Sequence, residues 1–443
     1  MRGISRSGRA PLTRRALTVA ALGAAASLPI TAHATPGGGR HRPREEGAAP
    51  GERWHRPEFR GVWLATVANL DWPSAPGLPV ARQQAELLAH LDKAVADRLN
   101  TVVFQARPTA DALWPSRYEP WSEYLTGTQG RDPGWDPLGF AVREAHRRGL
   151  ELHAWFNPYR IANHADPARL VPDHPARRHP EWVVTYGGKL LYNPGLPQVR
   201  RFVQDAIFDA VERYPIDAVH FDDYFYPYPV AGQTFDDDAA YAAYGGAFPD
   251  RASWRRDNVD RLVREVARRL RTGRGGLEAL SAPGLGGRRA RFGVSPFAVW
   301  RNRATDPSGS DTRAGTQTYD DLYADTRRWV REGWLDYVVP QVYWHLGFEV
   351  ADYAKLVPWW ADVVAGTRVR LCIGEALYKA GAPGQPAPWQ DPAELSRHLA
   401  FARAHREVRG HFFFSAKVVA EDRVGAMAKV VADHYRHPVR TPW

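Results

Sequence analysis

Residues 216–229, with the sequence IDAVHFDDYFYPYP, combine a buried strand with a cluster of acids and aromatic rings. The segment begins with apolar, β-prone residues such as Ile216 and Val219, which is typical of a strand buried on both faces. It then ends in two adjacent acids, Asp222 and Asp223, followed by Tyr-Phe-Tyr-Pro. The fold that would place acids and rings at the end of a buried strand depends on the segments around this one.

Apolar segments like this one recur from residue 59 onward and alternate with amphipathic helical segments. We predict strands at 59–67, 101–107, 150–157, 216–223, 291–297, 335–344, 368–377 and 408–416. We predict helices near 80–98, 137–148, 197–214, 251–271, 319–332, 351–365, 391–407 and 421–435. Eight strands alternating with eight helices predict an α/β protein with a single (β/α)8 TIM barrel. The main alternative is a doubly wound sheet, which would need a glycine-rich phosphate-binding turn after its first strand, and VANLDWPSAPG is not such a turn.

The N-terminal segment is predicted to lie outside this domain. Residues 1–34 contain the pair Arg14 and Arg15, an apolar run and a final Ala-His-Ala, which is typical of a twin-arginine signal peptide. The apolar run is too short to span a membrane, and no cysteine lies near the cleavage site. We therefore expect a secreted protein that is neither membrane-spanning nor a lipoprotein. Residues 35–53 are rich in Gly, Pro and charges and are expected to form a disordered linker, which leaves 54–443 for the barrel.

Charge and cysteine content exclude several classes of function. The formal charge of +10 includes +6 from residues 1–53, which contain nine arginines and three glutamates, so the rest carries only 10 − 6 = +4. An excess of this size does not indicate a nucleic-acid partner. The lone Cys372 excludes an internal disulfide and a cysteine-based zinc site. A second Gly-rich stretch, 271–290, is expected to be a loop within the domain.

The barrel prediction locates the functional site, because active sites of this fold form at the C-terminal ends of the strands. Alternation along a strand places Val219 and Phe221 under the helices, and directs His220 and Asp222 into the barrel mouth. The candidate catalytic residues are Asp222, Asp223 and Glu375. The candidate substrate-binding residues are Arg107, Asp111, Asn157, Arg160, His220, Tyr224, Gln341, Tyr343 and Trp344.

The loops after these strands are rich in aromatic residues, including Trp114, Tyr124, Tyr224 and Trp344. Aromatic faces beside polar groups suit sugar rings, whose C–H faces stack on them while the hydroxyls form hydrogen bonds. Carboxylates at the centre of such a cleft indicate glycoside hydrolysis, which requires one protonated acid and a second carboxylate. An acid among aromatic rings is desolvated, and this raises its pKa.

Several of these residues also have purely structural interpretations. Asp222 and Asp223 could cap the next helix or pair with arginines, and Glu375 could be an ion-pair partner. His220 and Asp222 have a spacing typical of metal ligands, but no third ligand is evident. Both histidines of the barrel, His153 and His220, are therefore expected to orient carboxylates or substrate.

The same alternatives apply to the residues predicted to bind the sugar. Arg107 and Asp111 could form a structural ion pair with each other or contact the substrate, and Asn157 and Arg160 have the same two interpretations. Trp344 is expected to form a wall of the substrate cleft.

Five long motifs resemble one bacterial family. The motifs are FRGVWLATVANLDWPS, QARPTADALWPSRYEPWSEYLTG, DPLGFAVREAHRRGLELHAWFNPYR, IDAVHFDDYFYPYP and YVVPQVYW. They are similar to the bacterial glycosyl-hydrolase-like family ten, and the resemblance runs from about 58 to 435. This family includes an envelope glycosidase that acts on peptide-free peptidoglycan glycans. The resemblance implies a (β/α)8 barrel, an exported location and hydrolysis of an envelope polysaccharide.

The fourth predicted strand also resembles the D-x-x-D-x-D-x-E pattern of chitinase-type barrels. On that pattern Asp217, His220, Asp222 and Tyr224 match in turn, so the final acid is missing here. This departure leaves Asp222 or Asp223 as the acid on this strand.

Together these observations predict a secreted glycoside hydrolase that acts on an amino-sugar cell-wall glycan. Asp222 would be the general acid/base or would stabilise a reacting acetamido group, Asp223 would be its neighbour or substitute, and Glu375 would be the second carboxylate. No cofactor is expected, and the sequence predicts no oligomeric state. Two alternatives remain, a non-catalytic glycan-binding barrel and a metal-dependent deacetylase or esterase that uses His220 and Asp222.

Overall fold

The computed structural model describes residues 56–272 and 289–443. The predicted signal peptide (1–34), the predicted linker (35–53) and most of the predicted loop 271–290 lie outside these described residues. Cys372 lies inside them and is fully buried. None of the helices in the described ranges combines the length and the apolar character that a bilayer crossing needs.

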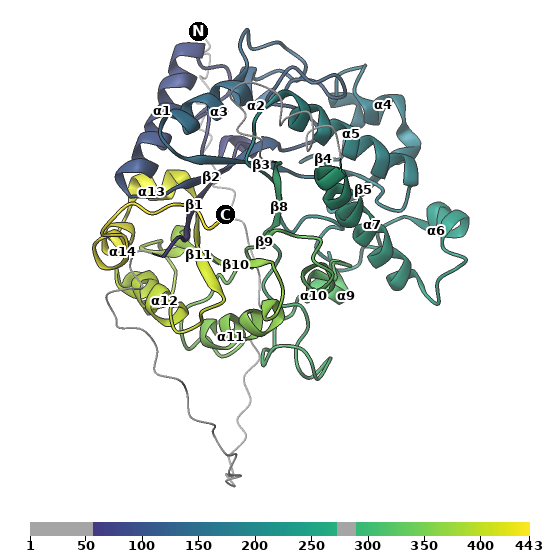
Figure 1. Cartoon of the computed structure of the whole chain (residues 1–443). Helices are drawn as coiled ribbons and strands as arrows, with labels where there is room; N and C mark the ends of the chain where they lie inside the picture. Colours follow the sequence, from purple (N-terminus) through teal and green to yellow (C-terminus); the bar gives the residue numbers. More distant parts are fainter. Residues whose placement is uncertain (1–55, 273–288) are drawn as a thin grey trace, which may run out of the picture. The chain divides into compact units, whose positions relative to one another are not determined.

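Eight parallel strands close into a barrel, which confirms the predicted fold (Figure 1). Around the barrel they follow in chain order: β1 (Phe59–Leu64), β2 (Thr101–Arg107), β3 (Glu151–Phe156), β7 (Ala218–Phe221), β8 (Arg291–Val294), β9 (Tyr337–Val338), β10 (Arg370–Glu375) and β11 (Val408–Phe414). Each of the eight predicted strands contains one of these, and the segment at 216–223 provides the fourth barrel strand. Most are shorter than predicted, because polar and aromatic residues at their C-terminal ends belong to the loops.

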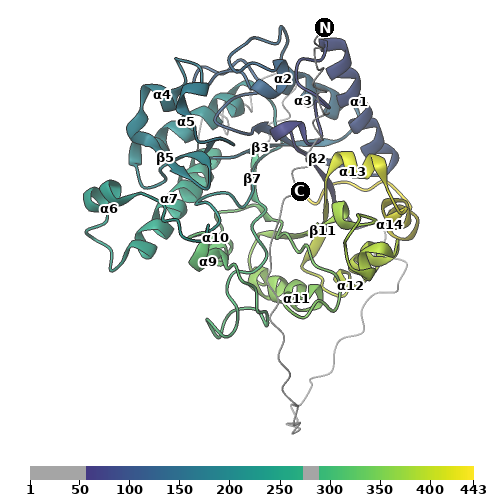
Figure 2. The same ribbon diagram turned by 180° about the vertical axis from the view of Figure 1, so that it is seen from behind.

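Helices surround the barrel strands in both views (Figures 1 and 2). They are α1 (Val80–Ala96), α3 (Pro137–Arg147), α5 (Pro197–Arg213), α7 (Arg251–Thr272), α9 (Thr318–Asp321), α10 (Thr326–Arg331), α11 (Tyr353–Val364), α12 (Glu394–Ala402), α13 (Ala416–Glu421) and α14 (Ala426–His434). The predicted helix 319–332 is divided into α9 and α10, whereas α13 lies almost entirely before the predicted helix 421–435, most of which is α14. Tyr323, with φ of 52°, lies between α9 and α10, and Asp422, with φ of 37°, ends α13, because a residue with positive φ interrupts a right-handed helix.

Shorter elements decorate the loops. A three-stranded antiparallel sheet, which the sequence did not predict, follows β3 and consists of β4 (Arg160–Ala162), β5 (Val183–Tyr186) and β6 (Lys189–Tyr192). The short helices α2 (Glu123–Thr126), α4 (Pro175–Arg178) and α6 (Asp238–Tyr244) lie in the loops after β2, β3 and β7. The long loops therefore gather at the C-terminal side of β2, β3 and β7.

Two hydrophobic cores hold the barrel. The larger one lies between the strands and the helices and contains Val219 and Phe221, as predicted from alternation. The smaller one fills the barrel and contains Trp63, Tyr337 and Phe412. Glycine is required at Gly293, since a Cβ atom there would lie 2.0 Å from the Tyr337 ring.

Capping side chains and glycines define several helix ends. Asp136 caps α3 by accepting a hydrogen bond from the backbone N–H of Gly139, with Pro137 in the first turn. Gly149 has φ of 72° and closes the turn between α3 and β3. Before α12, which begins at Glu394, the Asp391 carboxylate accepts a hydrogen bond from the backbone N–H of Ala393, at 2.9 Å.

Candidate active site

Asp222 and Asp223 follow directly after β7 and lie at the barrel mouth, with 5% and 7% of their surface exposed. One carboxylate oxygen of Asp222 accepts hydrogen bonds from the indole N–H of Trp155, at 3.1 Å, and from the side-chain amide of Asn157. The other oxygen accepts from the backbone N–H of Tyr224, at 3.1 Å. Three donors therefore hold the Asp222 carboxylate in one orientation.

Asp223 has a different set of partners. The phenol of Tyr228 donates to one of its oxygens, and the side-chain amide of Gln341 donates to the other, at 3.0 Å. The same Gln341 amide also donates to the backbone carbonyl of Ser295, at 2.8 Å, which fixes its orientation. Gln341, predicted to bind sugar, is thus already engaged with the second acid.

The two acids have raised pKa values. Burial raises the pKa of Asp222, although the Arg160 guanidinium nearby and the three donors oppose this effect. Burial and the charge of the neighbouring Asp222 together raise the pKa of Asp223 to about 6, against the opposing effect of the hydrogen bonds from Tyr228 and Gln341. Two neighbouring carboxylates do not ionise independently, so at mildly acidic pH one proton is retained by the pair. A retained proton beside an ionised carboxylate is the chemical requirement for acid/base catalysis.

Asn157 is fully buried and links Asp222 to the barrel wall. Its side-chain oxygen accepts hydrogen bonds from Gln105, at 2.7 Å, and from the guanidinium of Arg160, at 2.7 Å, and these contacts direct its amide toward Asp222. The Arg160 guanidinium also lies 5.3 Å from the centre of the Tyr224 ring. The predicted sugar ligand Asn157 is therefore a positioning residue for Asp222.

Arg107 has a structural role. It is fully buried, and its guanidinium pairs with the carboxylate of Glu119, with a distance of 2.6 Å from Nε to Oε2. Of the two interpretations left open for Arg107, the structure thus favours a structural ion pair, but with Glu119 as the partner in place of Asp111. Asp111 is itself fully buried and accepts from the backbone N–H of Thr109, at 3.0 Å, while burial raises its pKa to about 6. Neither side chain is exposed toward the mouth.

Glu375 lies outside the barrel mouth, and this corrects its predicted position. Along β10, Cys372 packs inside the barrel, whereas Leu371 and Ile373 pack between the strands and the helices. Alternation places Glu375 on the helix-facing side with Leu371 and Ile373. Its carboxylate is fully buried and makes three side-chain contacts there, to Tyr353 at 2.8 Å, to His398 at 2.8 Å and to His411 at 2.9 Å.

The environment of Glu375 also favours its ionised form. Despite burial, its pKa is lowered to about 2, because His398 and His411 lie against the carboxylate. A carboxyl with this pKa keeps no proton at physiological pH and is enclosed by its partners. Glu375 therefore forms a buried ion-pair cluster, which was the structural interpretation of this residue.

His220 belongs to the barrel interior below the acids. Its Nδ1 atom hydrogen-bonds the hydroxyl of Tyr337 at 2.8 Å, and its Nε2 atom lies 2.9 Å from the hydroxyl of Ser295 and 3.3 Å from the indole nitrogen of Trp63. Burial lowers its pKa well below the usual value. Within residues 56–272 and 289–443, no group of three or more His, Cys, Asp or Glu side chains is arranged to hold a metal ion. The residues present thus do not fit the ligand set proposed for a metal-dependent deacetylase.

A row of half-buried aromatic rings leads away from Asp223. The ring centres of Tyr224 and Tyr228 are 5.6 Å apart, those of Tyr228 and Phe297 6.3 Å apart, and those of Phe297 and Trp344 5.5 Å apart. The predicted substrate-binding residues Tyr224 and Trp344 are thus the two ends of one row. Tyr343 packs elsewhere, 5.8 Å from the Tyr378 ring. Phe297 is the member that the sequence did not single out.

Comparison with known proteins gives consistent matches. The family model described as "Glycosyl hydrolase-like 10" matches residues 58–391. Glycosyl hydrolase YngK of Bacillus subtilis (strain 168) is 48% identical over 387 residues, which cover 87% of this chain and 73% of the relative. Glycosyl hydrolase DigH of Escherichia coli (strain K12) is 42% identical over 376 residues, which cover 80% and 82%.

Among solved structures, the PgaB (BpsB) glycoside hydrolase domain from Bordetella bronchiseptica is similar to this chain with a TM-score of 0.51 and 13% identity. The match covers 86% of this chain and 99% of that domain. At this level of identity the likeness supports the barrel fold alone.

Proposed function

The chain belongs to the glycosyl hydrolase-like 10 family and is a glycoside hydrolase, and from this premise we propose that it cleaves an amino-sugar polysaccharide of the cell wall. Peptide-free peptidoglycan strands are the first substrate to test. The observation that carries the proposal is the pair of buried acids with raised pKa values at the barrel mouth, next to a row of aromatic rings. The acids supply the chemistry, and the rings offer a stacking surface for sugars.

The two acids have different roles in this proposal. Asp223 carries the proton and transfers it to the glycosidic oxygen as the bond from that oxygen to the anomeric carbon breaks. Asp222, held by three hydrogen-bond donors, is the ionised partner, and it stabilises the positive charge that develops on the sugar. Water completes the reaction by adding to the anomeric carbon, and the proton that it loses returns to the acid pair.

We further propose that the protein is secreted, with residues 1–34 as a twin-arginine signal peptide. Arg14 and Arg15 before an apolar run and a final Ala-His-Ala support this proposal. Changing both arginines to lysine in the full-length chain should leave the unprocessed protein inside the cell. Normal export of that variant would contradict the twin-arginine route.

The function is tested by digesting peptide-free glycan strands with the purified protein and identifying the products by mass spectrometry. Wild type should release shortened saccharides in which one water has been added for each cleaved bond. Asp222→Asn and Asp223→Asn should each lower kcat by about 10²- to 10⁴-fold, which is the usual effect of losing an acid/base group. Asp236→Asn is the matched control, since Asp236 is exposed on the loop after β7.

Three results would contradict the proposal. Binding of the strands without any product would favour a glycan-binding barrel. Loss of activity in a chelator would indicate a metal-dependent reaction. Unchanged turnover in both Asp222→Asn and Asp223→Asn would remove the acid pair from the mechanism.

A further inference from the structure

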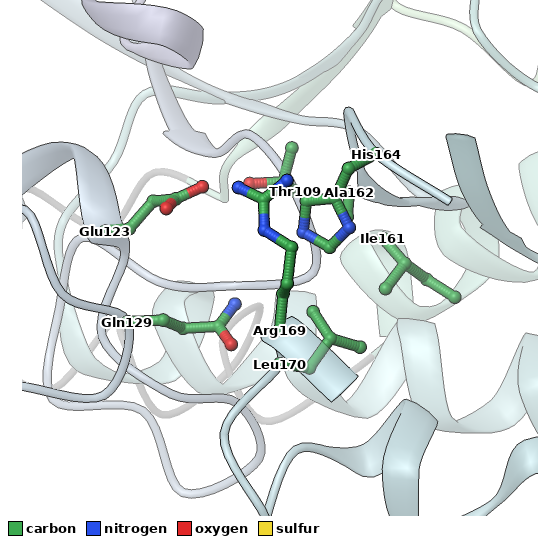
Figure 3. Close-up of a pocket in the computed structure, with 8 residues that line it drawn as sticks. All are labelled: Thr109, Glu123, Gln129, Ile161, Ala162, His164, Arg169 and Leu170. Atoms are coloured by element: carbon green, nitrogen blue, oxygen red, sulfur yellow. The ribbon is translucent and has the colours of Figure 1, made fainter. Parts of the chain in front are cut away.

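Two polar features in the described part of the protein are not used by the proposed reaction. One is a small cavity in the loops after β2 and β3, where Glu123, His164 and Arg169 are among the lining residues (Figure 3). The other is a line of polar side chains inside the barrel, below the acids. A continuous series of hydrogen bonds joins this second feature to Asp223, so it is the one that can influence the reaction.

Five side chains form the second feature, which we call the interior network. The Nε2 atom of His153 lies 3.1 Å from the carboxylate of Glu151, and its Nδ1 atom lies 2.8 Å from the hydroxyl of Tyr337. The same hydroxyl lies 2.8 Å from Nδ1 of His220, whose Nε2 atom lies 2.9 Å from the hydroxyl of Ser295. Glu151 and His153 belong to β3, Tyr337 to β9 and His220 to β7, and Ser295 follows β8. The four members other than Glu151 are buried.

The hydrogen bonds of the interior network run in one direction. The indole N–H of Trp63 lies 3.3 Å from Nε2 of His220 and can only donate, so this Nε2 atom accepts. Burial lowers the pKa of His220 well below its usual value, so the ring is neutral and carries its single proton on Nδ1. His220 therefore donates to the hydroxyl of Tyr337, which donates its own proton to Nδ1 of His153. His153 then donates from Nε2 to the carboxylate of Glu151.

Glu151 fixes this direction at the far end of the interior network. Its carboxylate also accepts hydrogen bonds from the indole N–H of Trp443, at 2.8 Å, and from the hydroxyl of Thr441. Burial disfavours the charged form of Glu151, but these donors and His153 outweigh this effect and lower its pKa. An ionised carboxylate can only accept, so it keeps each proton of the network directed away from Ser295.

Ser295 connects the interior network to the acid pair. Its hydroxyl donates to the unprotonated Nε2 of His220 at 2.9 Å, which is closer than the alternative acceptor, the carbonyl of Phe221, at 3.5 Å. Its backbone N–H donates to that same carbonyl, at 2.8 Å. Its backbone carbonyl accepts from the side-chain amide of Gln341, at 2.8 Å, and this amide group also donates to Asp223, at 3.0 Å. The direction of the Ser295 carbonyl thus determines where the Gln341 amide points.

We propose that the interior network positions the acid that protonates the glycosidic oxygen, because it holds Ser295 so that the Gln341 amide stays on Asp223. Its members act through Gln341 and are positioning residues. Branched apolar side chains usually fill a barrel of this kind, and polar groups buried there are costly unless they are hydrogen-bonded. A fully bonded polar network makes its surroundings rigid, which suits a group that must be held in place. The inference rests on the proposed function, since it assigns residues that support Asp223 in that reaction.

Tyr337→Phe and Ser295→Ala test the interior network with small changes. The first removes the hydroxyl between the two histidines and keeps the ring, and the second removes a hydroxyl and keeps the backbone carbonyl. Each should lower kcat on peptide-free glycan strands by about 3- to 10-fold and leave KM unchanged, which is the usual scale for one weakened hydrogen bond. Each should also move the alkaline limb of the kcat/KM profile up by about half a pH unit, because the Gln341 amide lowers the pKa of Asp223 and is held less firmly.

Both variants leave the ionisable groups around Asp223 in place. These groups are Asp222, Tyr224 and Tyr228 in the same loop, Tyr343 in the loop after β9, and Arg160 on β4, which acts on Asp222. Phe412→Leu is the matched control, since Phe412 lies in the same interior core with its ring centre 6.2 Å from that of Tyr337, and its side chain forms no hydrogen bond. It should lower Tm and keep the wild-type pH limb.

A double variant shows whether the interior network acts through Gln341. In a Gln341→Met background, Tyr337→Phe should produce no further shift of the alkaline limb. A further shift as large as the one in the wild-type background would overturn the proposal. If Tyr337→Phe does not fold, Ser295→Ala is combined with Gln341→Met, and the same two results decide.

A second readout does not need turnover. NMR titration of the Asp223 carboxyl carbon, assigned by comparison with Asp223→Asn, should show a higher pKa in Tyr337→Phe and Ser295→Ala and the wild-type pKa in Phe412→Leu. An unchanged pKa of Asp223 in both network variants, or an equal rise in Phe412→Leu, would overturn the positioning role. If wild type cleaved no glycan strand, the proposed function would fail, and this titration would still decide whether the interior network controls Asp223.

Discussion

Glu375→Gln should destabilise the protein while leaving its catalytic machinery in place. The carboxylate of Glu375 is fully buried and contacts Tyr353, His398 and His411 at 2.8–2.9 Å. Glutamine has almost the same shape but carries no charge, and its amide group would direct N–H donors at one of these partners. The substitution therefore removes the ion pairs without creating a cavity.

The expected size of the effect follows from two independent arguments. A pKa that is lowered from 4.5 to about 2 corresponds to roughly 3 kcal/mol of folding free energy at neutral pH, since one pKa unit is about 1.4 kcal/mol. Breaking a buried ion pair by removing one partner typically costs about 3–5 kcal/mol. Unfolding entropy is about 2 cal/mol/K per residue, so a chain of this length loses about 1 °C of Tm per kcal/mol. Glu375→Gln should thus lower Tm by about 3–5 °C.

The assay combines thermal unfolding with turnover of glycan strands at 25 °C, well below the transition. Glu375→Gln should show the lower Tm and a kcat within a few-fold of wild type. Asp222→Asn should show the opposite pattern. Burial raises the pKa of Asp222, so removing the charge of this side chain should leave Tm unchanged or slightly higher, while activity is lost. If Glu375→Gln abolished turnover with an unchanged Tm, the assignment of Glu375 to a structural cluster would be refuted.

Three further predictions concern pH and packing. The pH profile of kcat/KM should fall on its alkaline side near pH 6, where Asp223 loses its proton, and Tyr228→Phe should move that limb to higher pH, because the phenol lowers the pKa of Asp223. The difference in unfolding free energy between wild type and His398→Gln should be largest between about pH 4.5 and 6.5 in denaturant titrations. The pKa of Glu394 is lowered from 4.5 to about 2, so the contribution of this residue to the unfolding free energy is lost as the pH falls from 4.5 toward 2. The pKa of His398 is raised from 6.5, so the contribution of the histidine is lost as the pH rises above 6.5 and through the raised pKa. Gly293→Ala should yield little soluble protein when expression and Tm are compared with wild type, because its Cβ would overlap the tyrosine ring inside the barrel.

The barrel could be predicted from the sequence because each strand is a short apolar run with a clear end. The segment 101–107 matches β2 at both ends, and 408–416 differs from β11 only at its last two residues. The small sheet after β3 was not predictable in the same way. Its three strands are only three or four residues long, and they are defined by pairing with each other rather than by a periodic pattern.

The candidate site could be predicted where the strand itself determines which way each side chain points. Alternation along β7 correctly separated the core residues Val219 and Phe221 from the inward His220. The prediction was wrong where a partner distant in the sequence decides the role. Glu375 was placed at the mouth from its position at a strand end, although its own strand pattern directs it toward the helices, and the His398 that binds it is 23 residues away.

The contrast between these acids shows why position at a strand end is insufficient to identify a catalytic group. Glu375 ends one apolar strand, Asp223 lies just beyond another and both are buried, yet their pKa values move in opposite directions, to about 2 and about 6. Burial alone would disfavour the charged form of Glu375, but its histidine partners outweigh this effect, so these contacts contribute to stability. Burial beside Asp222 disfavours the charged form of Asp223, so its position costs folding energy, which is the pattern expected of a functional acid. Replacing each acid by its amide should therefore distinguish the two groups experimentally. Glu375→Gln should lower Tm, and Asp223→Asn should lower turnover.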